Sequence, residues 1–274
     1  MTINCNGTLI SLNRPKIMGI LNITPDSFYD GGKYTDQESV LQQVEKMLTD
    51  GATFIDIGAY SSRPGADDVD EETELKRILP IVQLVLEKYP EALLSIDTFR
   101  AKVAQACIER GAVMVNDISA GLRDKNMFSA IAKMGVPYIM MHMRGTPKNM
   151  QLKTHYEDML KEMLFFFSER LTLAKSLGIK DIIIDPGFGF AKTLEQNYEL
   201  LRRLDVLTLV EHPVLVGISR KSMIYKLLNT TSDEALNGTS ALHMVCLGKG
   251  AHILRVHDVK EAMECVRLHE QLIA

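Results

Sequence analysis

Polar side chains follow almost every short apolar run in this 274-residue sequence, and they form two chemical groups. Asp97, Asn116 and Asp185 offer carboxylate and amide edges, which suit a flat heterocycle that presents several N–H donors and a carbonyl. The second group offers cationic donors suited to phosphate or carboxylate. Its members are Lys221, Arg255, His257 and Arg63. Together the two groups predict a site that binds a polar ring at one end and an anion at the other.

The apolar runs are rich in β-branched residues and are separated by segments of helical period, which predicts strands alternating with helices. Eight runs are candidate parallel strands: Ile17–Ile23, Thr53–Gly58, Leu93–Thr98, Val113–Ser119, Tyr138–Met143, Asp181–Gly187, Val214–Ser219 and His252–Asp258. A glycine precedes many of them, where a left-handed residue would end the preceding helix. These glycines are Gly51, Gly111, Gly135, Gly178 and Gly250.

Eight strand–helix units in a chain of this length predict an α/β fold, a (β/α)8 barrel that forms a single domain over residues 1–274. An open doubly wound sheet is the alternative, because periodicity does not distinguish a closed barrel from an open edge. In a barrel the chemistry collects at the carboxyl ends of the strands. Side chains alternate along a strand, so Arg255 and His257 share a face and the polar groups can converge on one mouth.

Two helices can be predicted in more detail. Thr35 and Glu38 form a capping-box pattern, followed by an apolar face that Gly51 closes. Pro80 lies inside the helical pattern that runs from Glu71 to Tyr89, so we expect a kink there or two shorter helices.

Each candidate residue also has a structural interpretation. Asp97 could cap the helix that follows it. Asp56 and Asp117 are interpreted as structural or as supports for the site, and His142 as a buried histidine with satisfied hydrogen bonds. Two long loops, 22–35 and 59–70, contain residues typical of solvated turns, but loops at this end of a barrel also form lids and substrate contacts.

Composition excludes several classes of protein. The formal charge is −4, and 46% of residues are hydrophobic, which is ordinary for a globular domain and unfavourable for general binding of nucleic acid. The sequence contains no run of about 18 apolar residues, so it predicts no membrane span, and the opening segment does not resemble a signal peptide. The four cysteines lack CxxC spacing, which favours free thiols and a cytoplasmic location. The sequence also lacks an HExxH motif, which argues against a tight transition-metal site. It lacks Walker and GxGxxG motifs, which argues against a nucleotide-driven function.

Several longer motifs occur in a characteristic order. They are LNITPDSFYDGG, SSRPGA, SIDT, VNDISAG, DPGFGF, GISRKSMI, NGTSA and RVHD. From about Met18 to Val259, this arrangement resembles the dihydropteroate synthase family, the folate-pathway transferases that sulfonamides inhibit. The resemblance implies a (β/α)8 barrel, usually dimeric, that condenses 6-hydroxymethyl-7,8-dihydropterin pyrophosphate with 4-aminobenzoate. The products would be 7,8-dihydropteroate and pyrophosphate, with Mg2+ on the leaving group.

The resemblance also implies residue roles. The pterin would lie against Asp97, Asn116, Asp185 and Lys221, and Arg255 and His257 would hold the pyrophosphate. Asn22 would bind the metal or its water shell. The loop residues Thr24, Pro25, Phe28, Ser61, Ser62 and Arg63 would close over aminobenzoate together with Phe190, Lys221 and Ser222.

In the reaction that the resemblance implies, the C–O bond to pyrophosphate breaks before the amine attacks, so a dihydropterin cation forms. Asp97 would stabilise this cation, and Arg255, His257 and Mg2+ would stabilise the departing pyrophosphate. Aminobenzoate then needs no strong base, which agrees with the lack of a Ser/His/Asp or Cys/His constellation.

The chain departs from the family pattern at Ser61-Ser62, where many members have two threonines; both hydroxyls are retained. One alternative is a methyltetrahydrofolate-dependent methyltransferase, which shares the Asp, Asn and Asp strand ends but does not need the anion-binding cluster. Another is a catalytically inactive barrel retained for binding or assembly, which would be expected to have lost some of the strand-end polar groups.

Overall fold

The computed structural model describes residues 1–23, 33–60 and 69–273, in which eight parallel strands form one sheet. The sheet has the order β8-β7-β6-β5-β4-β3-β10-β9. Its strands are β3 (Lys16–Asn22), β4 (Phe54–Gly58), β5 (Leu93–Asp97), β6 (Met114–Asp117), β7 (Tyr138–Met141), β8 (Ile182–Asp185), β9 (Leu215–Val216) and β10 (Ile253–Val256). All eight lie within the runs predicted from the sequence, apart from the first residue of β3.

The two edge strands of this order, β8 and β9, meet and close the sheet. Ile184 pairs with Val214 in a parallel bridge, and the Ile184 N–H donates to the Pro213 carbonyl at 2.9 Å. This contact confirms a barrel rather than an open sheet. The closure is short because β9 has only two residues.

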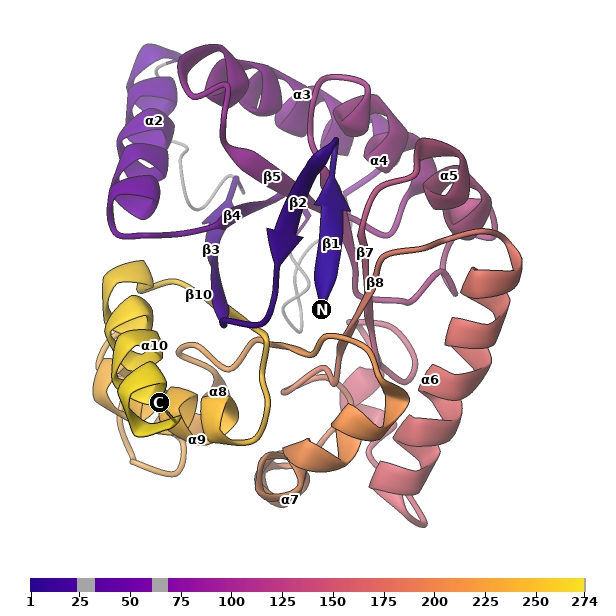
Figure 1. The fold of residues 1–274 in the computed structure, drawn as a ribbon, viewed down its shortest axis with the longest axis vertical. Coiled ribbons are helices and arrows are strands. Elements are labelled where there is room, and N and C mark those ends of the chain that lie inside the picture. Colours follow the sequence, from indigo (N-terminus) through magenta and orange to yellow (C-terminus); the bar gives the residue numbers. More distant parts are fainter. Residues whose placement is uncertain (24–32, 61–68, 274) are drawn as a thin grey trace.

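Helices surround the strands of the barrel, as Figure 1 shows. The α-helices are α2 (Lys33–Thr49), α3 (Glu71–Lys88), α4 (Ala101–Ile108), α5 (Met127–Met134), α6 (Met159–Ser176), α7 (Leu194–Arg202), α8 (Ser222–Tyr225), α9 (Leu236–Gly248) and α10 (Val259–Ile273). Two 3-10 helices, η1 (Met150–Leu152) and η2 (Leu204–Val210), lie in the connections. Among the described residues, no helix is both long and apolar enough to cross a bilayer.

An antiparallel hairpin, β1 (Thr2–Cys5) and β2 (Thr8–Ser11), was not predicted and lies across the middle of the barrel in Figure 1. Ile3, Cys5 and Leu12 are at most 2% exposed. They pack with apolar side chains from the amino-terminal ends of the strands, including Met18 and Phe54. The hairpin therefore seals the amino-terminal end of the barrel, because its alternating buried residues complete that apolar layer.

One helix prediction was wrong in detail, and one of the two alternatives for a second helix, a division at Pro80, is excluded. Helix α2 begins at Lys33, so Thr35 lies inside its first turn and is not the cap; its buried face and its end at Gly51 were predicted correctly. Helix α3 runs through Pro80 as one helix, although proline removes a backbone donor there. Ile78 and Val82, which are fully buried on either side, hold the chain on the barrel.

The five glycines predicted to end helices all have positive φ, between 68° and 105°.

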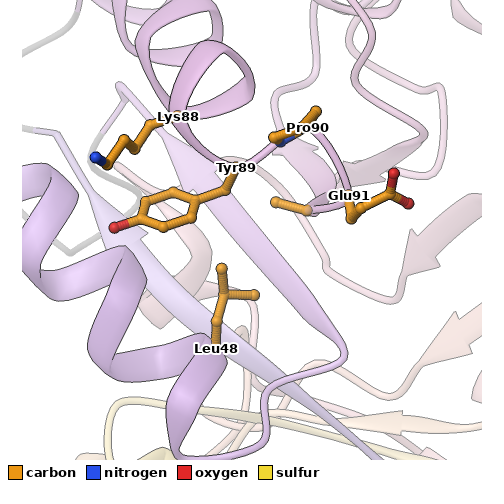
Figure 2. Close-up of a pocket in the computed structure, with 6 residues that line it drawn as sticks. Leu48, Lys88, Tyr89, Pro90 and Glu91 are labelled. Atoms are coloured by element: carbon orange, nitrogen blue, oxygen red, sulfur yellow. The ribbon is translucent and has the colours of Figure 1, made fainter.

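A separate surface groove lies at the amino-terminal end of the barrel, where residues 88–92 lead into β5. Figure 2 shows its lining, with Leu48 of α2 near the Tyr89 ring and the charged ends of Lys88 and Glu91 turned outward. This groove is remote from the carboxyl ends of the strands, where the predicted site residues lie.

Candidate active site

The inner face of the barrel changes from apolar to polar along the strands. On β4, Phe54 belongs to the sealed apolar layer, and Asp56, two residues later, lies among polar groups. On β10 the same change takes place between Ile253 and Arg255. Because alternate residues of a strand face the same side, each strand delivers an apolar group low in the barrel and a polar group nearer its mouth.

Arg255 forms the centre of an ionic network inside this mouth. Its Nε donates to Asp56 Oδ2 at 2.6 Å, and a terminal nitrogen donates to Asp97 Oδ2 at 2.8 Å. Asp56 Oδ2 also accepts a hydrogen bond from Asn116 Nδ2 at 2.9 Å. Strands β4, β5, β6 and β10 are thus joined through side chains as well as through the sheet.

Asp97 is directed into this network and does not cap a helix. Helix α4 begins after Arg100, and its first backbone N–H, from Ala101, donates to Asp124 Oδ2 at 2.8 Å. Burial raises the pKa of Asp97 to about 7; the positive charge of Arg255 opposes this shift, and the neighbouring carboxylate of Asp56 adds to it. A perturbed carboxyl group in a cavity is typical of a functional position.

Asp185 and Lys221 occupy the opposite wall. Asp185 is 7% exposed, and its carboxylate accepts the Gly187 N–H at 2.7 Å. Lys221 Nζ donates to the Phe188 carbonyl at 2.6 Å and lies 4.9 Å from the centre of the Phe190 ring. Burial lowers the pKa of Lys221 to about 8, and the nearby Asp185 carboxylate works against this shift.

One cavity collects most of the predicted ring-binding residues. It is lined by Asp97, Asn116, Ile118, Met141, Asp185, Phe190, Gly217, Lys221 and Arg255. The polar members come from four strands and the turn after β9, and the apolar members offer flat or flexible surfaces for a ring. Carboxylates, an amide and two cations around apolar walls are suited to a polar heterocycle that carries an anionic group.

Three further predicted residues lie at carboxyl ends of strands but outside the lining of this cavity. Asn22 is the last residue of β3, and Ser222 is the first residue of α8. His257 is exposed and follows β10; its backbone N–H donates to Ser219 Oγ at 3.2 Å, and its Nδ1 lies 3.0 Å from the same oxygen. The exposed imidazole is therefore held at the mouth by the neighbouring turn.

Six predicted loop residues lie outside the described part of the chain. They are Thr24, Pro25, Phe28, Ser61, Ser62 and Arg63. Among the described residues, no group of three or more His, Cys, Asp or Glu side chains is arranged to hold a metal.

Comparison with known families adds to this geometry. A family model described as "Pterin binding enzyme" matches residues 18–257, which include all eight barrel strands except the first two residues of β3.

The chain belongs to the pterin-binding enzyme family.

Relatives of this pterin-binding enzyme are similar over their whole length. The dihydropteroate synthase of Escherichia coli strain K12 is 41% identical over 276 residues, covering 100% of this chain and 97% of that protein. A crystal structure of Yersinia pestis dihydropteroate synthase with a sulfonamide drug superposes with a TM-score of 0.93 at 41% identity, covering 100% of this chain and 99% of that one. The Xanthomonas albilineans dihydropteroate synthase with 4-aminobenzoic acid has a TM-score of 0.92 at 36% identity, covering 100% and 98%.

Sequence reasoning interpreted two other residues correctly. Asp117 is fully buried and accepts hydrogen bonds from Ser119, from the Gly121 N–H and from the Tyr138 hydroxyl. It is therefore structural. His142 is 2% exposed and contacts Lys192 Nζ through Nδ1 at 3.2 Å, as expected of a buried histidine with a partner.

Two features of the candidate site were missed. Asp56 was interpreted only as support, yet it joins the predicted pterin side chain Asn116 to the predicted pyrophosphate side chain Arg255. Its inward position could have been inferred from the spacing of Phe54, Asp56 and Gly58 along one strand. Lys192 was not singled out, because a lysine after a loop is usually solvated.

Proposed function

We propose that this enzyme is a transferase of folate biosynthesis that condenses 6-hydroxymethyl-7,8-dihydropterin pyrophosphate with 4-aminobenzoate. The products are 7,8-dihydropteroate and pyrophosphate. The observation that carries the proposal is the single cavity in which Asp97, Asn116 and Asp185 face Lys221 and Arg255. The full-length relatives named above support this reaction over methyl transfer or an inactive barrel.

The pterin ring has N–H groups and a carbonyl, and the cavity offers complementary partners. The Asp97 and Asp185 carboxylates accept hydrogen bonds from N–H groups of the ring, and the Asn116 amide can accept and donate. Lys221 donates a hydrogen bond to an acceptor atom of the ring. Ile118, Met141 and Phe190 provide the apolar walls. The ring therefore occupies the buried part of the cavity and its pyrophosphate extends toward the mouth.

When the C–O bond to pyrophosphate breaks first, positive charge develops on the dihydropterin and negative charge develops on the departing pyrophosphate. The Asp97 carboxylate stabilises the dihydropterin cation, and Arg255 and His257 stabilise the leaving pyrophosphate. Arg255 donates a hydrogen bond to Asp97 in the structure, so pyrophosphate oxygens compete with that carboxylate for the guanidinium. Binding of the ester frees the Asp97 carboxylate to face the ring as the cation forms.

Mg2+ is the metal proposed for this reaction, with Asn22 as the protein group that holds it or its water shell. Mg2+ usually keeps several waters and binds through one or two protein oxygens plus substrate phosphates. A single amide oxygen at the end of β3 fits that pattern. The metal would neutralise negative charge on the pyrophosphate.

The aminobenzoate site is proposed to lie between Phe190, Lys221 and Ser222 and the two loops that contain Thr24, Pro25, Phe28, Ser61, Ser62 and Arg63. Ser222 opens α8, and the Phe190 ring faces the Lys221 ammonium. An aromatic carboxylate could stack on the ring and meet the cation. Sulfonamides are proposed to compete for this position, since a relative has been solved with a sulfonamide drug.

A cytoplasmic homodimer is the proposed state of the enzyme. Apolar side chains are exposed on α9, on α10 and in the turn that follows α8, and α9 packs on α10. They are Leu227, Leu228, Val245, Leu268 and Leu272. A second copy could cover this surface, and light scattering coupled to size exclusion would give the mass in solution.

The deciding experiment measures pyrophosphate release from the pterin ester with Mg2+, with and without 4-aminobenzoate, and identifies the product by mass. Release that depends on aminobenzoate and yields dihydropteroate is the expected result. Tight binding of the ester without turnover would contradict the proposed reaction while leaving a pterin-binding site. Absence of ester binding would contradict both.

A further inference from the structure

We propose that Lys192 is a positioning residue that fixes the segment 187–191, and through it Phe190 and Lys221, for binding of the aromatic amine substrate. This inference rests on the proposed function. Lys192 is 3% exposed and, among the described residues, forms no ion pair with a carboxylate. A lysine is rarely buried in this way unless its donors are satisfied.

Three acceptors surround the Lys192 ammonium. Its Nζ lies 3.0 Å from the Gly187 carbonyl, 3.1 Å from the Phe190 carbonyl and 3.2 Å from His142 Nδ1. An ammonium has three donor protons, so each one finds a partner. Burial lowers the pKa of His142 well below its usual value, which keeps the imidazole neutral and able to accept at Nδ1. Burial also lowers the pKa of Lys192, to about 7, and Asp185 opposes this shift.

The carbonyls of this segment are divided between two lysines. Those of Gly187 and Phe190 bind Lys192 on the core side, and that of Phe188 binds Lys221 in the cavity wall at 2.6 Å. The Phe190 ring in turn faces the Lys221 ammonium. A displacement of the segment would therefore move both groups proposed to bind aminobenzoate.

The backbone of the segment needs this support. Gly187, Gly189 and Ala191 all have positive φ, at 68°, 81° and 50°. A Cβ at Gly187 would lie 2.2 Å from the His142 carbonyl oxygen, so the backbone approaches β7 closely. Left-handed conformations are retained when surrounding contacts hold them. Lys192 supplies two such contacts, and Asn197 supplies another by accepting the Gly189 N–H at 2.7 Å.

Asp185 is held independently of Lys192, because it belongs to β8 and pairs with Met141 of β7. Loss of Lys192 should therefore affect the two substrates unequally. The pterin ring keeps Asp97, Asn116 and Asp185 and loses only the fixed position of Lys221 and of one apolar wall. Aminobenzoate loses the fixed positions of Phe190 and Lys221, which are two of the three described side chains proposed to bind it. A general structural role would instead weaken both substrates together.

The test compares Lys192→Met with Lys180→Met, which makes the same change at an exposed lysine just before β8. In Lys192→Met we expect the KM for aminobenzoate to rise about tenfold, the scale of one hydrogen bond to a charged group, while the KM for the pterin ester stays within about twofold. Lys180→Met should change neither constant. An equal rise in both KM values, or no rise at all, would overturn the inference.

Amide hydrogen exchange of the ligand-free proteins provides a second measurement that does not depend on turnover. Residues 187–191 should exchange at least about tenfold faster in Lys192→Met than in the wild type or Lys180→Met. Unchanged exchange would refute the positioning role even if activity fell. If the wild type failed to turn over the proposed substrates, the proposed function would fail and the exchange result would still decide the role of Lys192.

Should Lys192→Met not fold, His142→Leu removes one acceptor and leaves the two carbonyl contacts in place. We expect a smaller change in the same direction, with faster exchange of residues 187–191. Exchange equal to that of the wild type in folded His142→Leu would show that the acceptor set does not hold the segment.

Discussion

The two ends of the barrel are built for different purposes. The amino-terminal end is closed by the β1–β2 hairpin, whose Ile3, Cys5 and Leu12 join an apolar layer from the strands. The carboxyl-terminal end places Asp56, Asp97 and Arg255 in direct contact. One end gains stability from burial, whereas the other keeps charges partly desolvated and ready for a ligand.

Residues that stabilise the fold and residues proposed for catalysis therefore lie at opposite ends of the barrel axis. A substitution at the closed end should change the free energy of unfolding and leave turnover nearly unaltered. A substitution at the mouth should do the reverse or should change binding of one part of a substrate. Three variants and one change of pH test this separation, and they follow in the order of their expected effect on catalysis.

Asp97→Asn should have the largest effect, because the amide keeps the shape of the side chain and loses the negative charge that faces the cation. We expect turnover to fall on the order of 100-fold or more, with a small loss in pterin affinity. Steady-state kinetics together with calorimetry of the pterin ester would measure both quantities. Losses of equal size in binding and turnover would contradict charge stabilisation as the role of Asp97.

Arg255→Ala should mainly weaken recognition of the anion. We expect affinity for the pterin pyrophosphate ester to fall by roughly tenfold or more, since a charged hydrogen-bond donor is removed. The plain pterin alcohol should bind about as before. Calorimetry with both ligands decides the matter, and a parallel loss for the alcohol would place Arg255 in ring binding. Thermal unfolding is the necessary control, because the variant leaves the buried Asp56 without its cation.

The pH dependence of stability should reveal the strain at the mouth. Burial raises the pKa of Asp97 from 3.8 to about 7, so the folded chain retains a proton that the unfolded chain releases between those values. The folded state then binds more protons, and the free energy of unfolding decreases as pH rises through this window. Relative to Asp97→Asn, the wild type should lose stability between about pH 4 and pH 7 in urea unfolding. Parallel curves for the two proteins would show that Asp97 is not strained in the folded state.

Leu12→Ala should have the smallest effect on catalysis. Leu12 is 1% exposed at the closed end, and its truncation should lower the free energy of unfolding by about 2 to 4 kcal/mol. Leu9→Ala is the matched control, because Leu9 lies in the same hairpin and is 71% exposed. Urea unfolding measures the stability, and turnover of the folded variant should stay within about twofold. A tenfold loss of turnover would show that the two ends are coupled.

Much of this arrangement could be predicted from sequence, because strands and strand ends are local signals. Each β-branched run is followed by its polar residue within a few positions, so Asp97, Asn116 and Asp185 were identified without knowledge of their neighbours. The hairpin was missed because Thr2–Cys5 and Thr8–Ser11 are short and largely polar. Their burial depends on the barrel that they cover.

The ionic partners could not be predicted in the same way. Asp56 and Arg255 are separated by 199 residues in the sequence, and they meet because β4 and β10 both pair with β3 in the sheet. The acceptors of Lys192 include His142, which follows β7 and is 50 residues away in the sequence. The roles of these residues depend on tertiary contacts, which local periodicity does not encode.

The short closure between β8 and β9 has a consequence for the lifetime of the protein against proteases. One bridge pair joins these strands, and β9 contributes only two residues to the sheet. Asp185 ends β8, and Lys221 follows the turn after β9, so a ring held by both residues spans the closure. A ligand in the cavity therefore adds contacts between β8 and β9, where the backbone forms the fewest pairings. Resistance of the barrel to proteases should then depend partly on whether the ligand is bound.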